Sequence, residues 1–168
     1  NPDWTGAANS NWSITTNWSD GNVPNGAGHV ANFVGNSFNR YSVAVDGAGK
    51  TASTINFRSA SSYTIGITSG NAITLDAANG DAATVNVSAG NHTIAAPIVA
   101  ADALGINVTP ANSTLTLSGN VSGLALTKHG FGKLALGGAN TYSGSIFAKY
   151  GTIDVTGAVS AAQFSSIG

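Results

Sequence analysis

The chain has 168 residues, enough for one domain with a substantial core, and its formal net charge at pH 7 is −1. Charged residues make up 8% of it and hydrophobic residues 42%, which excludes a chain kept disordered by its charge. There is no cysteine, so disulfides and thiolate metal sites are excluded as well.

Residues 1–35 differ from the rest because they contain all three tryptophans, Trp4, Trp12 and Trp18. The first turn of a coiled stack of strands exposes an apolar end and unpaired strand edges, which something must cover. We therefore expect this Trp- and Asn-rich segment, with Phe33, to cap the N-terminal end. The alternative is an aromatic platform on which sugar rings stack.

Residues 36–157 contain many short runs in which Val, Ile or Leu alternates with Thr, Ser, Asn or Ala, as at residues 41–45 and 104–108. Alternation at period two is typical of half-buried strands, and glycine-containing turns separate the runs. The runs follow one another too closely for crossover helices. We expect an all-β parallel β-helix (β-solenoid) of roughly seven or eight turns, each of about 20 residues. A β-sandwich or jelly roll is the alternative.

The most regular pattern lies at residues 124–155, where three alternating apolar runs are separated by glycine turns. This stretch resembles the passenger-associated β-strand repeat of bacterial autotransporters and related surface proteins. The matching residues are Leu126, Thr127, Lys128, Gly130, Gly132, Leu134, Leu136, then residues 138–144 with Asn140, Tyr142 and Gly144, and residues 151–153 beginning with Gly151. The resemblance implies a right-handed parallel β-helix and a structural, secretion-associated role. Phe131, Lys133 and Ser145 depart from the family's pattern.

Residues 158–168 are weakly apolar and carry no charge. We expect them to form either a C-terminal cap or an assembly tail, whose apolar side chains Phe164 and Ile167 are covered by the next molecule.

The residues offer little for catalysis, and we expect no enzyme activity, cofactor or metal. The acids are spread along the chain; Asp76 and Asp81 stand in turn contexts where Asp bonds its own backbone. The histidines, His29, His92 and His129, are far apart and are expected in exposed strands or turns. Lys128 and Lys133 are expected to solvate a neutral surface. A polysaccharide-processing enzyme would need charged groups converging on one groove, and this chain has few.

Seven Asn-x-Ser/Thr sequons would mark surface glycosylation in a secreted eukaryotic protein, and a bacterial origin would leave most of them unused. They begin at Asn11, Asn17, Asn86, Asn91, Asn107, Asn112 and Asn120.

From these features we expect a secreted or cell-surface bacterial structural β-solenoid that assembles head to tail into extracellular filaments. The alternative is an adhesin or carbohydrate-binding passenger domain that uses the tryptophans or exposed Tyr63 and Tyr142. The expected partners are further copies of the chain or an extracellular polysaccharide. No basic cluster recruits nucleic acid, and no stretch reaches the roughly 18 apolar residues of a membrane span.

Overall fold

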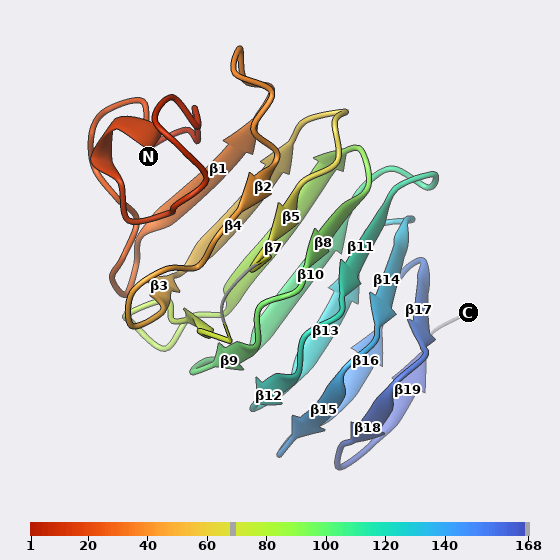
Figure 1. Cartoon of the computed structure of the whole chain (residues 1–168). Helices are drawn as coiled ribbons and strands as arrows, with labels where there is room; N and C mark the ends of the chain where they lie inside the picture. The colour runs from red at the N-terminus through yellow and green to blue at the C-terminus, as the bar shows by residue number, and fades with distance from the viewer. Residues whose placement is uncertain (68–69, 167–168) are drawn as a thin grey trace.

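A computed structural model describes residues 1–67 and 70–166 of the chain. The described chain coils into a parallel β-solenoid of about six turns (Figure 1). Successive strands go in rotation to three sheets, and every neighbouring pair of strands within a sheet is parallel. The expected all-β solenoid is confirmed, and the sandwich alternative is wrong because antiparallel sheets would define it.

The strands of the three sheets have the following bounds. The first sheet contains β1 (Val30–Val34), β4 (Thr54–Arg58), β7 (Ala83–Ala89), β10 (Leu104–Val108), β13 (Leu126–His129), β16 (Ile146–Ala148) and β19 (Phe164–Ser166). The second contains β2 (Ser42–Val43), β5 (Thr64–Ile65), β8 (His92–Ile94), β11 (Thr114–Leu117), β14 (Lys133–Leu136) and β17 (Thr152–Val155). The third contains β3 (Lys50–Ala52), β6 (Ile73–Leu75), β9 (Ile98–Ala100), β12 (Val121–Gly123), β15 (Ala139–Tyr142) and β18 (Ala158–Ser160).

The core lies inside the coil, because alternate side chains point inward in most strands, such as β7, β10 and β11, and stack on their counterparts one turn away. In the first sheet, Phe33 pairs in register with Phe57, and Phe57 with Val87; all three are buried. Neighbouring strands lie about 4.8 Å apart, so apolar side chains in register contact one another along the coil. Each fully buried aliphatic side chain contributes roughly 1.5–3 kcal/mol to stability.

The turns differ in length, which explains why there are fewer of them than expected. In register on neighbouring strands, Asn32 and Asn56 lie 24 residues apart and Asn56 and Asn86 lie 30 apart, whereas Asn140 and Val159 lie only 19 apart. The residues before β1 form no turn of the solenoid; they contain one short 3₁₀ helix, η1 (Thr15–Asn17), and lie over its N-terminal end (Figure 1).

Candidate functional site

The N-terminal segment covers the outer edge of the first strand in all three sheets. In the first sheet, the backbone N–H of Trp4 donates to the Asn32 carbonyl (2.8 Å), and the backbone N–H of Asn32 donates to the Pro2 carbonyl (3.2 Å). Two more exchanges of this kind cover the other sheets: residues 10–12 bond Ala44 just after β2, and residues 25–26 bond Thr51 of β3. The described N-terminal segment therefore bonds the outer edge of each sheet at one position: Asn32 of β1, Ala44 just after β2, and Thr51 of β3.

The three tryptophans form the apolar part of this cap. Trp4 and Trp12 are 0% exposed and Trp18 is 2% exposed. The rings of Trp12 and Trp18 lie 5.3 Å apart, and Trp12 lies 5.4 Å from Phe33 of β1. Each indole N–H donates to a backbone carbonyl, that of Arg40, Pro24 or Trp12. The alternative of a sugar-stacking platform is wrong for these residues, because none of the rings presents a free face.

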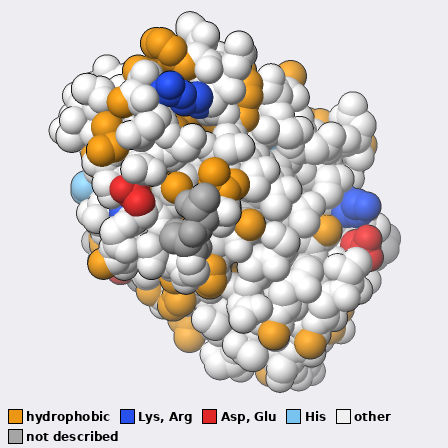
Figure 2. Space-filling view, in the orientation of Figure 1, with side chains coloured by type: hydrophobic (Ala, Val, Ile, Leu, Met, Phe, Trp, Pro, Cys, Tyr) orange, Lys and Arg blue, Asp and Glu red, His pale blue; other side chains and the backbone are white. Residues whose placement is uncertain are grey.

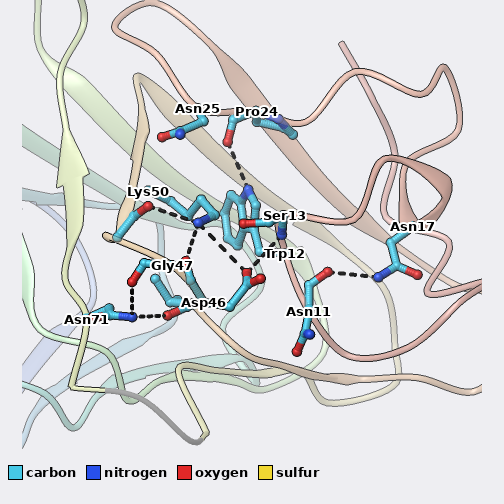
Figure 3. Close-up of polar contacts among 12 residues, drawn as sticks. Asn11, Trp12, Ser13, Asn17, Pro24, Asn25, Asp46, Gly47, Lys50 and Asn71 are labelled. Atoms are coloured by element: carbon cyan, nitrogen blue, oxygen red, sulfur yellow. Dashed lines mark hydrogen bonds and ion pairs between the residues drawn. The ribbon is translucent and has the colours of Figure 1, made fainter.

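Polar bonds fasten the cap to the first turn (Figure 3). The Ser13 N–H donates to Asp46 Oδ1 (2.9 Å), and the buried Lys50 ammonium donates to the carbonyls of Asp46 and Gly49 at the same corner. Lys50 Nζ also lies 3.8 Å from the Asp46 carboxylate. From the next turn, Asn71 Nδ2 donates to the Gly47 carbonyl (2.7 Å). The corner between β2 and β3 is thus bonded on both sides.

The C-terminal end is built differently. Within residues 1–67 and 70–166, no strand pairs with the outer edge of β17, β18 or β19, the last strands of the three sheets. Side chains that occupy inward positions are exposed here: Phe164 is 51% exposed and Val155 39% exposed. Their counterparts one turn earlier, Ile146 and Leu136, are fully buried. Residues 158–166 therefore continue the coil as a further turn, and Ile167 lies outside the described residues.

The residues of the predicted repeat have mainly structural contacts. Asn140 is buried and joins three successive turns: its Oδ1 accepts from the Val121 N–H (3.1 Å), and its Nδ2 donates to the carbonyls of Gly138 (2.8 Å) and Ala158 (3.2 Å). Leu134 and Leu136 are core residues, and Gly132 and Gly144 lie close to the backbone of the preceding turn.

Two glycines of the repeat are required by the backbone. Gly130 and Gly151 have φ values of +76° and +68°. A Cβ at Gly130 would lie 2.2 Å from the Val108 carbonyl oxygen, and one at Gly151 2.3 Å from the Gly132 carbonyl oxygen. Only glycine fits both the conformation and the close approach.

Lys128 corrects an expectation, because it is fully buried rather than solvent-exposed. It occupies an inward position in β13, between Ile106 and Ala148 in register. Its ammonium donates to the carbonyls of His129 (2.6 Å), Gly130 (2.8 Å) and Tyr150 (3.4 Å). Burial lowers the pKa of Lys128 to about 8. Lys133, in contrast, is exposed as expected and lies 3.8 Å from the Asp154 carboxylate.

His92 and Tyr63 are also buried, against expectation. The His92 ring stacks on Phe57 with centroids 4.4 Å apart. Its Nδ1 accepts from the Tyr63 N–H (3.1 Å), so the proton of the neutral ring is on Nε2, which donates to the Ala89 carbonyl (2.7 Å). Burial lowers the pKa of His92 and raises that of Tyr63 to about 12. Of the other histidines, His29 is exposed as expected and His129 is half-buried.

Neither tyrosine named as an exposed glycan contact is at the surface. Tyr63 is fully buried and donates its hydroxyl to the Val34 carbonyl (2.5 Å). Tyr142 is 5% exposed, and its hydroxyl has no hydrogen-bond partner among the described residues. Burial raises the pKa of Tyr142.

The seven sequon asparagines differ in how far they are buried. Asn17 is fully buried and its amide bonds Ala8, Asn9 and Asn11, so glycosylation there is excluded by the fold. Three other sequon asparagines are exposed, and three are half-buried. The exposed residues are Asn91, Asn112 and Asn120; the half-buried ones are Asn11, Asn86 and Asn107.

The outer surface of the coil is polar and nearly uncharged. Hydroxyl rows follow the outward positions, such as Thr64, Thr93 and Thr116 in the second sheet and Thr51 with Thr74 in the third. Figure 2 shows one face that is mostly neutral, with charged side chains only at scattered positions. A shallow groove of about 200 Å³ crosses the first sheet at β4, β7 and β10.

Acidic residues do not assemble into a site. Asp76 caps its own turn, as expected, by accepting from the Ala78 N–H (2.8 Å). Among the described residues there is no group of three His, Asp or Glu side chains that could hold a metal ion. No described helix has the length and hydropathy to cross a bilayer.

The described chain is therefore a parallel β-solenoid that is capped at its N-terminal end and whose last strands, β17, β18 and β19, have no partner among the described residues on their outer edges; these edges are called the open end below. A search of family models, curated proteins and solved structures found no match to this chain. The likeness to autotransporter repeats consequently remains a prediction from residues 124–155.

Proposed function

We propose that this chain is an extracellular structural module, and that its open C-terminal end joins the same end of a second copy. The observation that carries the proposal is the difference between the ends. The first strands are paired by the N-terminal segment, whereas the outer edges of β17, β18 and β19 have no partner in the described chain.

An unpaired strand edge presents a row of N–H and C=O groups that another chain can pair with. At this end the row surrounds apolar side chains: Phe164 and Val155 are exposed, and Ile153 and Val159 are half-buried against the core. Contact with another β-sheet edge would complete the hydrogen bonds and cover these side chains.

A second copy suits this end because the last turn carries almost no charge. Asp154 is the only charged residue of residues 152–166, and it pairs with Lys133 of its own chain. Two such ends can approach without like-charge repulsion.

The structure favours contact between two C-terminal ends over the head-to-tail filament expected from the sequence. Head-to-tail strand addition needs a free edge at the N-terminal end, and residues 2–26 already bond Asn32 of β1, Ala44 just after β2, and Thr51 of β3 there. A contact between identical ends is isologous and closes as a dimer with two-fold symmetry.

The extracellular location rests on composition. The chain combines a hydroxyl- and amide-rich outer surface with only 8% charged residues, a combination typical of secreted β-solenoids. The chain has no cysteine, and stacked apolar rows with parallel ladders in three sheets stabilise the solenoid.

Light scattering coupled to size-exclusion chromatography, from micromolar to millimolar protein, tests the proposal. We expect a dimer that the Phe164→Lys change converts to a monomer. The control is Val99→Lys, which alters a 43% exposed apolar residue on a lateral face and should leave the dimer intact. A wild-type monomer at every concentration would refute self-association, and filaments by electron microscopy would restore the head-to-tail mode.

A further inference from the structure

The groove on the first sheet lies on the side of the coil, away from the open end. It is lined by side chains of Asn56, Arg58, Asn86, Ser88, Asn107 and Thr109, on three successive turns. The register between β4 and β7 shifts after Phe57, so that Arg58 pairs with Ala89 and Ser88 is inserted. This irregularity locally interrupts the ladder beside the row of asparagines.

An amide ladder runs along the groove. Asn56 Nδ2 donates to Asn32 Oδ1, and Asn86 Nδ2 donates to Asn56 Oδ1, both at 2.9 Å. The chain of bonds stops there: no described residue donates to Asn86 Oδ1, and none accepts from Asn107 Nδ2. The groove thus offers the Asn86 acceptor, whose amide is held by its bond to Asn56, and, on the neighbouring strand, the Asn107 amide donor, which is unpaired among the described residues.

Arg58 supplies the only charge among the residues that line the groove. It is exposed, and no described residue forms an ion pair or hydrogen bond with its guanidinium; both ion pairs of the described chain lie elsewhere. A planar guanidinium matches the two oxygens of a carboxylate. A free Arg beside aligned amides and hydroxyls therefore fits a ligand that combines a carboxylate with several hydroxyls.

We propose that this groove binds a linear acidic polysaccharide built from uronic acids. Arg58 pairs with a sugar carboxylate, while Asn86, Asn107 and Thr109 exchange hydrogen bonds with hydroxyls. The three strands span about 10 Å, room for a short stretch of the polymer. One cation is too few for nucleic acid, whose affinity depends on several phosphate contacts. The groove lining has no exposed aromatic ring, which disfavours a neutral sugar held by stacking.

Calorimetric titration of the whole chain with oligogalacturonate, and in parallel with its methyl-esterified form, tests the proposal. We expect the acidic oligomer to bind and esterification to weaken binding at least tenfold. Arg58→Gln should weaken binding at least tenfold, and Asn86→Ala should weaken it as well. Lys149→Gln is the matched control, because it removes an exposed positive charge outside the groove and should leave affinity unchanged.

Several results would overturn the proposal. These are no binding of the acidic oligomer at millimolar concentrations, equal binding of the esterified form, equal losses from Arg58→Gln and Lys149→Gln, or tighter binding of single-stranded DNA. Arg58 is exposed and makes no described bond, so the variant should fold normally, and circular dichroism verifies this. The oligomeric state plays no part in this test, so its outcome is separate from that of the proposed dimer.

Discussion

The two ends of the solenoid both carry large apolar side chains, but these side chains are buried at one end and exposed at the other. At the N-terminal end, Trp12 and Phe33 are fully buried. At the C-terminal end, Phe164 is half exposed although it stacks in register on the buried Ile146. In a β-solenoid a strand buries its inward side chains only when another layer lies beyond it, so an end must be either capped or joined to a partner.

The largest expected effect is at the capped end. Trp12→Ala removes a fully buried ring and its bond to the Pro24 carbonyl, and should lower the free energy of unfolding by about 3–5 kcal/mol. Denaturant titration measures the change. Phe131→Ala, at a residue that is 69% exposed, is the control and should change stability by less than about 0.5 kcal/mol. Equal small losses in both variants would mean that the cap does not stabilise the coil.

Substitution of Asn140 tests whether side-chain bonds between successive turns stabilise the coil near the open end. Asn140→Ala leaves the Val121 N–H and the Gly138 and Ala158 carbonyls without this partner, and should cost about 2–3 kcal/mol. Asn120→Ala, at an exposed residue with one bond to the Ala139 N–H, should cost about 1 kcal/mol or less. Thermal unfolding of both variants measures the two decreases in Tm. Equal decreases would contradict the expectation that Asn140 stabilises the coil more than Asn120 does.

The buried Lys128 makes stability depend on pH. Its pKa is about 8 in the folded state and near 10.5 when unfolded, so between these values the unfolded chain binds more protons and stability rises with pH. From pH 8 to 9.5 we expect a gain of about 2 kcal/mol. The Tyr63 pKa of about 12 acts in the opposite direction, but only above about pH 10, where the unfolded tyrosine ionises.

Denaturant titrations at several pH values measure this slope. Lys128→Met should abolish it, whereas Lys133→Met, at an exposed residue, should retain it. A wild-type stability that stays level or falls between pH 8 and 9.5 would show that Lys128 keeps its ordinary pKa.

The smallest effect is expected at the open end. Phe164→Ala in the monomer should cost less than about 1 kcal/mol, because half of the side chain is already in water, whereas Ile146→Ala one turn earlier should cost about 2–5 kcal/mol. Denaturation at low protein concentration measures both. At concentrations where the dimer forms, the Phe164→Ala loss should grow, and a loss independent of concentration would argue against the dimer.

Much of the fold was predictable because it depends on local pattern. Period-two alternation with glycine turns predicted the solenoid, and the concentration of tryptophans predicted the cap. The glycines of the repeat predicted turns between the strands. Gly130 and Gly151 have positive φ values, a conformation that other residues rarely adopt. The number of turns was overestimated, since turn length varies and the cap residues add no turn.

The sequence by itself therefore determined the strand class, the inward apolar rows and the location of the cap. Only the tertiary structure decided which polar residues are buried and which surfaces remain free. His92, Lys128 and Asn140 are buried because carbonyl and N–H groups from adjacent turns bond them, and the groove forms because Asn56, Asn86 and Asn107 align. Asn56, Asn86 and Asn107 lie on successive turns of unequal length. Their spacing in the sequence is therefore not constant, and the sequence alone does not predict that they are neighbours.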